Sequence, residues 1–230
     1  MWTLRVFAAA LALMAAIMVV AGVFSLPPQD RPFAKLNLED PIGAFTASRI
    51  AALRRDADAC LALAALSKLE VAPIPDLRER GFCRLENAVT LTRSAHPYSR
   101  PTRLSCALAA ALYVWEREVV AEAARTHLRA TVARIETLGS YSCRRVYGGA
   151  EGRVSFHATG EAIDVSGFRL ADGRLVSIRR DWGSKSAEGQ FLRAVRDGGC
   201  RVFRAVLSPE YNAAHADHFH LDVGDYTICR

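Results

Sequence analysis

The sequence predicts an α+β domain, a small antiparallel sheet with flanking helices, preceded by an N-terminal transmembrane helix. Three observations indicate this fold class. Residues 6–26 form an uncharged, mostly apolar run, apolar residues then recur at helical spacing, and short strand-like segments separated by turns begin near residue 130. At 230 residues, the chain is long enough to bury the core of one ordinary domain.

The first 26 residues are expected to cross a membrane. Their apolar run of 21 residues can span a bilayer as a helix, whereas the core of a signal peptide is shorter, at roughly 7–15 residues. No Ala-x-Ala cleavage site follows, so we expect an uncleaved single-pass anchor over residues 1–26, with a cleaved signal peptide as the alternative. Arg5 and the α-amino group favour a cytoplasmic N-terminus, which places the folded part outside the cytoplasm.

Residues 27–43 are polar and interrupted by prolines, which is typical of a tether. The domain follows over residues 44–230. Its first part (44–129) is predicted to be mainly helical scaffold, with elements at 47–69 (helix, ended by Pro73 and Pro75), 85–91 (short strand) and from Ser105 through Ala123 (long helix).

The second part (130–230) changes to short strands. The predicted strands are 131–138, 162–168, 175–178, 202–207 and 218–223, with a hairpin turn at Asp172-Gly173. A helix is predicted over 187–196, and Gly198-Gly199 is expected to end it.

Six cysteines fit an exported domain: Cys60, Cys83, Cys106, Cys143, Cys200 and Cys229. They are even in number, widely spaced and without a C-x-x-C pair, which favours three disulfides over a cysteine-ligated zinc. The connectivity cannot be deduced from spacing alone. We expect at least Cys200 to pair with Cys229, because the two flank the strand predicted at 218–223.

The chain is basic, with a net charge of +6 and a pI of about 9.2. Such a balance suits nucleic acid, anionic lipid or an anionic polymer. No Lys/Arg run with interleaved aromatic residues suggests a nucleic-acid groove, so we expect no nucleic-acid partner.

Two segments, 155–164 and 215–222, concentrate the chemistry of the sequence. They hold four of the six histidines, about fifty residues apart. Alternate residues of a strand share a face, so His218, His220 and Asp222 point one way. Their apolar neighbours point the other way, toward a core, and the same reasoning places Asp164 opposite Ile163 and Val165. The two strands are therefore expected to turn polar groups toward a common cleft.

A catalytic zinc needs three His, Asp or Glu ligands and one open position for water. His157, Asp164 and His220 would supply that set. Asp164, between two apolar neighbours, would be a costly buried carboxylate unless it paired with a metal or another cation. For each histidine, the alternative is an ordinary surface or hydrogen-bonded residue. His218 cannot be equivalent to His220, because two residues along a strand are separated by roughly 6.6 Å.

A family resemblance rests on these residues. Ser-x-His-x-x-Gly-x-Ala-x-Asp followed by His-x-His resembles the signature of the zinc D-Ala-D-Ala peptidases and their relatives, the LAS group with the Hedgehog-like fold. The run from about Cys83 to Cys229, roughly two thirds of the chain, resembles the bacterial extensin-like C-terminal domain family. Its pattern is visible in Gly139–Arg144, Ser155–Asp164, Gly167-Phe168, Asp172-Gly173, Phe191-Leu192 and His215–Asp222.

The resemblance implies a Hedgehog/DD-peptidase-like fold that binds Zn2+ and acts on cell-wall peptides. It makes His220 the ligand in preference to His218, which would instead support the ligands or stabilise an oxyanion. Asp217, three residues before His220, matches the position of a general base, with His218 as its competitor. Ser155 and Arg144 match substrate-binding positions, and Arg144 would also polarise a carbonyl, although Arg145 could replace it. His215 could support the ligands or be a plain loop residue.

We therefore expect a zinc-dependent peptidase, anchored in the cytoplasmic membrane with its C-terminal domain in the periplasm, that acts on peptidoglycan stem peptides or crosslinks. The cut bond could be D-Ala-D-Ala, a D,D crosslink or L-Ala-D-Glu. The alternative is a non-catalytic module that binds the cell wall on the same fold, since a fold does not determine a function. A purely structural anchor, and serine catalysis without a Gly-x-Ser-x-Gly elbow, are weaker hypotheses.

Overall fold

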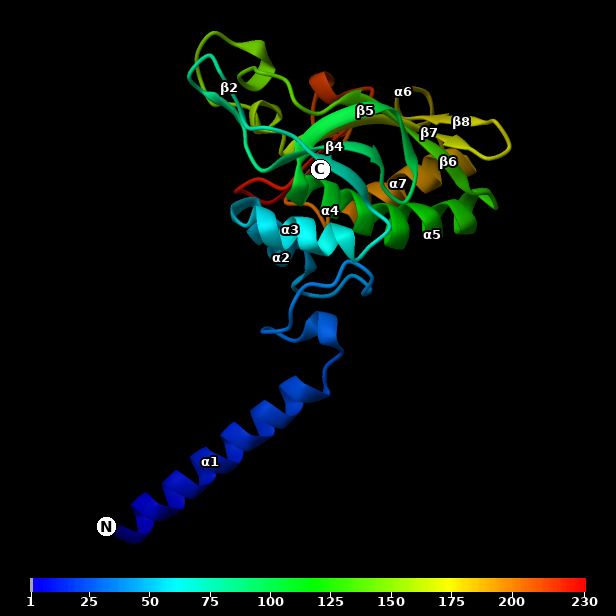
Figure 1. Cartoon of the computed structure of the whole chain (residues 1–230). Helices are drawn as coiled ribbons and strands as arrows, with labels where there is room; N and C mark the ends of the chain where they lie inside the picture. The colour runs from blue at the N-terminus through cyan, green and yellow to red at the C-terminus, as the bar shows by residue number, and fades with distance from the viewer. Residues whose placement is uncertain (1) are drawn as a thin grey trace.

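The computed structural model describes residues 2–230 as one long helix and an α+β domain (Figure 1). Helix α1 (Trp2–Ser25) projects away from the domain. Its segment Arg5–Ser25 has a mean hydropathy of 2.7 over 21 residues and is not buried against the rest of the chain. The helix is long and apolar enough to cross a membrane, in agreement with the sequence prediction.

The segment after α1 packs against the domain along much of its length. Arg49 donates a hydrogen bond to the carbonyl of Gln29 (3.1 Å). Arg117 donates to the carbonyls of Leu38 (3.0 Å) and Asp40 (2.8 Å). The Leu38 side chain is 1% exposed and belongs to the hydrophobic core. The second half of the segment predicted as a tether is thus folded onto the domain.

The first helical stretch is two helices rather than the one predicted over 47–69. Helix α2 (Thr46–Ala52) continues into a 3-10 turn (Leu53–Arg55), and α3 (Ala57–Ala65) follows. Asp56 separates them, because its carboxylate accepts a hydrogen bond from the backbone N of Ala59 (3.0 Å) and so starts a new helix.

The long helix predicted after Ser105 is present. Helix α4 (Cys106–Trp115) continues through a π-helical turn (Glu116–Val120), α5 (Ala121–Ala123) and a second π-helical turn (Ala124–Leu128). Every residue of α4 is buried, so this helix forms the centre of the core. Ser105 begins it by accepting a hydrogen bond from the backbone N of Leu108 (3.2 Å).

The main sheet is large and mixed, and the prediction of a small antiparallel sheet is wrong in this respect. Its order is β1-β4-β5-β6-β7-β10-β9-β11, with β8 paired to β7, and two pairs, β5–β6 and β9–β11, are parallel. The strands are β1 (Glu70–Pro73), β4 (Ala88–Arg93), β5 (Pro97–Ser105), β6 (Val132–Gly139), β7 (Ala162–Leu170), β8 (Leu175–Ser177), β9 (Ala205–Leu207), β10 (Phe219–Asp222) and β11 (Ile228–Cys229). A separate hairpin pairs β2 (Leu77–Glu79) with β3 (Cys83–Leu85).

Strand β5 explains much of this error. It contains Pro97 and Pro101, which normally argue against an interior strand. Its register with β6 consists of the single pair Tyr98–Ile135 within the described residues, so few ladder bonds are lost on that side. The strand predicted at 85–91 is likewise split, because Asn87 between β3 and β4 adopts a left-handed backbone (φ 51°).

The predicted strands 131–138, 162–168, 175–178 and 218–223 correspond to β6, β7, β8 and β10, whereas 202–207 is a strand only over β9. The predicted helix 187–196 is α7 (Ala187–Gly199), which extends three residues further and ends at the predicted Gly198-Gly199 pair. A Cβ atom on Gly198 would lie 2.3 Å from Val119 Cγ1, so this glycine also permits close helix packing.

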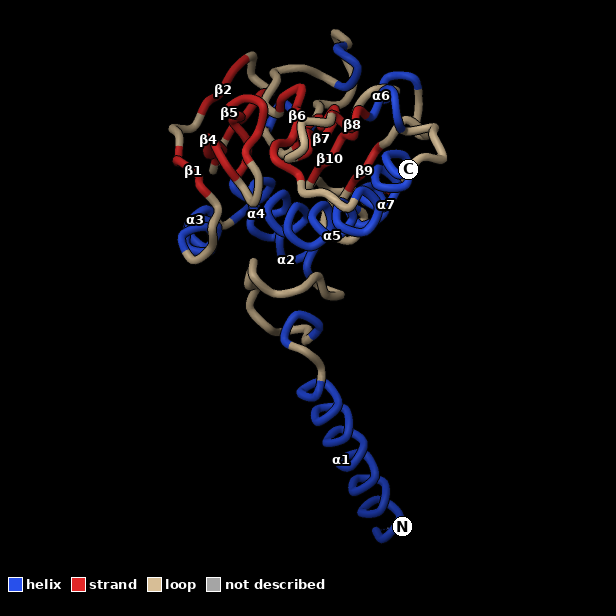
Figure 2. Tube along the Cα trace, turned by 90° about the vertical axis from the view of Figure 1, so that its right-hand side faces the viewer, coloured by secondary structure: helices blue, strands red, loops and turns tan. Residues whose placement is uncertain are grey.

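Helices α4, α5 and α7 lie together on one side of the strands (Figure 2). Trp115 of α4 is fully buried, and its Nε1 donates to the carbonyl of Val195 in α7 (3.1 Å). The apolar residues of β7 and β10 join the same core, namely Ile163, Val165, Phe219 and Leu221. By strand alternation, the polar residues between them face away from that core.

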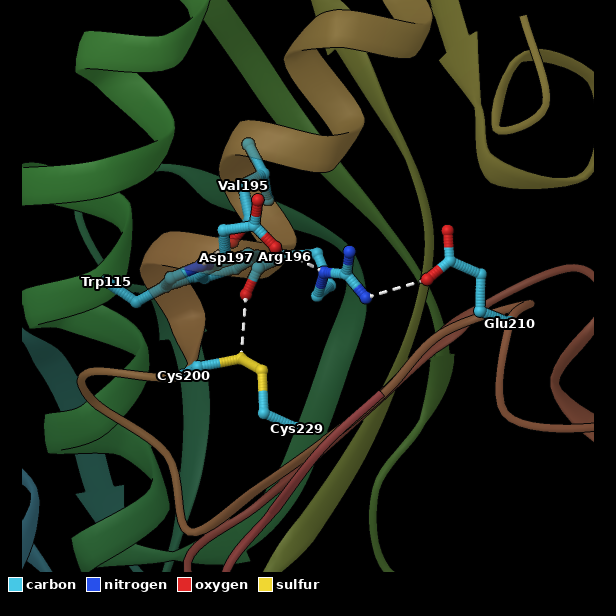
Figure 3. Close-up of a disulfide and its surroundings, with 7 residues drawn as sticks. All are labelled: Trp115, Val195, Arg196, Asp197, Cys200, Glu210 and Cys229. Carbon is cyan, nitrogen blue, oxygen red and sulfur yellow. Dashed lines mark hydrogen bonds and ion pairs between the residues drawn. A yellow bond between two sulfur atoms is a disulfide. The ribbon is translucent and has the colours of Figure 1, made fainter.

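Three disulfides brace the domain, as the cysteine count predicts. Cys60–Cys106 joins α3 to α4, and Cys83–Cys143 joins β3 to the loop after β6. Cys200–Cys229, the one pair predicted individually, links the end of α7 to β11 (Figure 3). It holds the C-terminal strand beside β9, which in turn pairs with β10.

Candidate metal centre

The pairing of β7 with β10 places two of the predicted ligands side by side. In this antiparallel ladder, His220 lies opposite Asp164. Phe219 and Leu221 are buried in the core at 0% and 1% exposure, which turns His220 to the other face. The apolar alternation of the two strands thus determines where both polar side chains point.

A tight turn delivers the third predicted ligand. His157 lies in a 3-10 turn (Phe156–Thr159), and the Ser155 hydroxyl accepts a hydrogen bond from the His157 backbone N (3.3 Å). Gly160 ends the turn with a left-handed backbone (φ 66°) that returns the chain to β7. A Cβ at Gly160 would lie 2.4 Å from Leu85 Cδ1, so this approach requires glycine.

The structure brings His157, Asp164 and His220 together. His157 Nε2 is 3.1 Å from His220 Nδ1 and 3.2 Å from Asp164 Oδ1, and His220 Nδ1 is 3.1 Å from Asp164 Oδ1. We refer to these three residues as the ligand trio. Tetrahedral zinc with ligands at about 2.0–2.1 Å places the ligand atoms roughly 3.3–3.4 Å apart. The nearly equilateral triangle therefore fits a single ion with little adjustment.

Outer partners orient both imidazoles. His157 Nδ1 donates to the carbonyl of Ser140 (2.7 Å), which leaves the lone pair of Nε2 directed at the trio. His220 Nε2 donates to Asp222 Oδ2 (3.2 Å), which leaves the lone pair of Nδ1 for the same point. Asp222 is fully buried and is itself held by the backbone N of Gly224 (2.9 Å). With these tautomers three acceptor atoms would face one another, and a shared proton or a metal ion between them would relieve their repulsion.

The pKa values of Asp164 and His220 also indicate that the trio favours a positive charge. Burial raises the pKa of Asp164, but hydrogen bonds from His157 and His220 outweigh it and hold that pKa well below its usual range. Burial lowers the pKa of His220, but Asp164 and Asp222 outweigh it and raise the pKa to about 9. Without a metal, this centre retains a proton near neutral pH, and a divalent ion would replace it.

The two candidates for the general base form a pair. His218 Nδ1 donates to Asp217 Oδ1 (2.8 Å), so its Nε2 is the free nitrogen, 3.6 Å from Asp164 Oδ1. The His218 side chain is 12% exposed and that of Asp217 is 48% exposed. Asp217 lies behind His218, in a separate hollow beside β8, and His218 is the member of the pair that reaches the trio.

His215 also lies against the trio. Its ring stands 5.8 Å from the His220 ring and 5.3 Å from the His218 ring, centre to centre. Its Nδ1 is held by Asn212 Oδ1 (2.8 Å). Burial, together with the neighbouring His220 and His218, lowers the pKa of His215 to about 4. His215 is therefore neutral near pH 7 and adds no positive charge beside the trio.

A cavity of about 300 Å³ opens over the trio. Arg144 and Ser155, the two predicted substrate-binding residues, both line it. Arg145 does not, because its guanidinium lies over the Phe82 ring at 4.6 Å. Several further residues line the cavity and were not predicted from the sequence, namely Tyr147, Arg153, Phe156, Tyr211, Asp225 and Tyr226. They come from loops and short 3-10 turns without a repeating apolar pattern, so periodicity could not identify them.

Fold and site together define a disulfide-braced α+β domain with a candidate metal centre at the base of a cavity. Residues 58–230 match the model of the family described as extensin-like protein C-terminus. The chain belongs to this family, as the resemblance in the sequence indicated, and the match begins earlier than the run from Cys83. No curated protein and no solved structure matches the chain.

Proposed function

We propose that this protein is a membrane-anchored, zinc-dependent peptidase that acts on peptidoglycan stem peptides or crosslinks in the periplasm, with a Hedgehog/DD-peptidase-like site. One observation carries the proposal. Three acceptor atoms, His157 Nε2, Asp164 Oδ1 and His220 Nδ1, converge within 3.2 Å of one another at the base of a cavity. The paired sequence motifs, which resemble those of zinc D-Ala-D-Ala peptidases, support the same reaction class.

The donor set favours zinc over the harder divalent ions. Two imidazole nitrogens and one carboxylate oxygen suit zinc, whereas calcium and magnesium prefer oxygen ligands. Three protein ligands are typical of catalytic zinc sites, since structural sites usually have four. The cavity above the trio provides the side from which water and substrate would approach.

His218 is the better placed of the two base candidates. When bound, zinc would lower the pKa of its water and polarise the substrate carbonyl. Because His218 Nδ1 carries the hydrogen that Asp217 accepts, Nε2 has a free lone pair, and Nε2 faces the trio. It can therefore accept a proton from that water and pass it to the leaving amine. Asp217 holds Nδ1–H and thereby keeps Nε2 in its basic form. In this proposal Asp217 orients the base instead of being the base itself.

The cavity walls suit a short peptide with a carboxylate. Arg144 and Arg153 line the cavity, and Arg153 also lies over the Tyr226 ring at 5.4 Å. A guanidinium pairs well with a carboxylate, so these arginines would bind an acidic group of the stem peptide. Ser155 lines the cavity beside them and offers a hydroxyl to the peptide backbone.

Two features support a placement outside the cytoplasm. Helix α1 can span a membrane, and three disulfides persist mainly in oxidising compartments. The net charge of +6 would favour approach to an anionic wall polymer.

A non-catalytic module that binds the cell wall is the second candidate. The observation in its favour is Asp217, which occupies the position of the expected base but lies outside the cavity that contains the trio. A protein of this kind would retain the metal and the peptide-binding arginines without hydrolysis.

The test uses the full-length, oxidised protein in detergent. We expect about one zinc per chain and release of new products from purified muropeptides. His220→Ala should lose both zinc and turnover, and His127→Ala, which lies outside the cavity, should keep both. Stoichiometric zinc with unaltered muropeptides would establish the binding module instead, and a wild-type chain that never retains metal would refute both zinc-based proposals.

A further inference from the structure

Arg54 joins the helical part of the domain to the metal centre. It lies in the middle of the 3-10 turn between α2 and α3, more than a hundred residues from the segment it contacts. Its guanidinium binds Glu161 in a fork, with Nε 2.6 Å from Oε1 and Nη2 3.0 Å from Oε2. Its remaining nitrogen, Nη1, donates to Asp225 Oδ1 (2.5 Å). All three guanidinium nitrogens of Arg54 thus donate to carboxylates on two different loops.

Both loops border the cavity. Glu161 connects the turn that carries His157 to strand β7, and its backbone N donates to the Phe156 carbonyl (2.9 Å). The Glu161 carbonyl accepts from the backbone N of Val223 (3.1 Å), just after β10. Asp225 follows in that second loop and lines the cavity. Arg54 therefore braces the two segments between which the trio is assembled.

The contact is more enclosed than an ordinary surface ion pair. The Arg54 side chain is 19% exposed and that of Glu161 is 13% exposed, so solvent screens their attraction only partly. The Arg54 guanidinium also lies 5.9 Å from the centre of the Phe156 ring, next to His157. Forked arginine–carboxylate geometry adds orientation as well as energy, which a single-point contact would not supply.

We propose that Arg54 is a positioning residue for the metal centre, which holds the His157 turn and the loop after β10 at the spacing that the ligand trio requires. The role toward zinc rests on the proposed function, whereas the bracing of the two loops does not. Arg54 lies outside the matched family region, residues 58–230, so the segment before that region contributes to the site. The first helices are then part of the functional unit and not only scaffold.

The test compares Arg54→Ala with Arg55→Ala, an adjacent arginine that is exposed. Zinc affinity of the full-length protein in detergent is measured by competition with a chelator. Because loss of an outer partner typically costs about 10–100-fold in metal affinity, we expect Arg54→Ala to weaken zinc binding by roughly tenfold. Arg54→Lys keeps the charge but cannot form the forked contact, so its zinc affinity should lie between those of Arg54→Ala and the wild type. Arg55→Ala should have the zinc affinity of the wild type.

A second measurement needs no metal. Hydrogen exchange of the zinc-free protein should be faster at the amides of Glu161 and Val223 in Arg54→Ala, and unchanged in the β4–β5 ladder. Asp225→Asn removes only one of the two loop contacts and should accelerate exchange at Val223 more than at Glu161. It provides the same test if Arg54→Ala fails to fold.

The outcomes separate the two proposals. If the wild type binds zinc and Arg54→Ala binds it equally well, Arg54 is not a positioning residue, even if the variant unfolds more easily. If the wild type binds no zinc, the proposed function fails and the exchange data decide the bracing alone. Unchanged exchange at Glu161 and Val223 would then overturn this inference, and faster exchange confined to them would support it.

Discussion

Asp222 Oδ2 lies 3.2 Å from His220 Nε2, on the side of the imidazole opposite to the ligand trio. The two residues are separated by one position in β10 and point the same way, so the strand itself supplies the outer partner of its own candidate ligand. Asp222 is fully buried, and its second oxygen is occupied by the backbone N of Gly224. This pairing leads to the first prediction.

Asp222→Asn should weaken zinc binding without abolishing it. The amide would no longer accept from His220 Nε2–H with a full negative charge, so Nδ1 becomes a poorer donor to the metal. We expect a 10–100-fold loss of zinc affinity, the usual range for an outer partner, with turnover recovered at saturating zinc. Chelator competition measures the affinity, and Asp172→Asn in the exposed hairpin turn is the matched control. Unchanged affinity in Asp222→Asn would show that this contact does not tune His220.

Zinc affinity should rise with pH and each ion should displace a proton. The pKa of His220 is raised to about 9 in the metal-free chain, because Asp164 and Asp222 outweigh the effect of burial. Metal must therefore replace a proton at pH 7, and affinity should increase about tenfold per pH unit between about pH 6.5 and 9. The same raised pKa stabilises the metal-free fold below about pH 6.5, a contribution that is lost as the pH rises through about 9.

Calorimetry in buffers of different ionisation enthalpy checks this count. Near pH 7.5, we expect about one proton released per zinc bound. Binding that releases no proton would mean that His220 is already neutral and that the carboxylates do not hold its proton.

His218→Ala should retain zinc and lose turnover. Removal of a general base typically lowers the rate by about 10²–10⁴-fold, and the trio does not include His218. Asp217→Asn should lower turnover less, since it only removes the group that holds His218 Nδ1–H. Turnover numbers with a muropeptide substrate and zinc content measure both effects. If Asp217→Asn were the more damaging change, Asp217 would be the base, as its position in the sequence motif suggests.

Glu116 should make the stability of the domain depend on pH. It is fully buried, with Oε1 accepting from the Tyr98 hydroxyl (2.6 Å) and Oε2 from the backbone N of His96 (2.8 Å). Burial outweighs these hydrogen bonds and raises the pKa of Glu116 from 4.5 to about 8. Between these values the unfolded chain releases a proton that the folded chain keeps, so stability falls by about 1.4 kcal/mol per pH unit.

Glu116→Gln should remove this part of the pH dependence. Urea unfolding of the wild type and the variant at about pH 5 and pH 8 measures the difference, and Glu122→Gln on the exposed side of the same helix is the control. The wild type should lose stability relative to Glu116→Gln as the pH rises. Parallel pH profiles for the two proteins would contradict a buried, protonated Glu116.

The Cys200–Cys229 disulfide should stabilise the C-terminal edge of the sheet. The two cysteines are separated by 29 residues, and closing a loop of that length is worth about 3–4 kcal/mol in the chain-entropy model. Cys200→Ser with Cys229→Ser should therefore lower the free energy of unfolding by that order, measured by urea titration at constant pH. A loss below about 1 kcal/mol would show that β11 is held by its ladder with β9 instead.

The candidate site was largely predictable because its signals are local. Alternation in β10 places His220 opposite Leu221 and Phe219, and the same rule applied to β7 places Asp164 on the matching face. Other parts of the site have no such signal. His157 Nδ1 donates to the backbone carbonyl of Ser140. Every residue has such a carbonyl, so the amino-acid sequence does not indicate which one is the partner.

The errors in the fold are of the opposite kind, since long-range packing overrode local preference. Pro101 would normally argue against a strand inside a sheet. Strand β5 accommodates this proline because, within the described residues, β5 pairs with β6 at a single pair of residues. Asp56 is a cap inside a stretch whose apolar period continues on both sides.

The burial of Leu38 has a mechanical consequence for a chain anchored by α1. Even if all of residues 27–35 detached from the domain, nine extended residues would reach at most about 30 Å. Arg49 shortens that reach further by holding the carbonyl of Gln29. A domain anchored in this way would therefore stay close to the surface of the membrane.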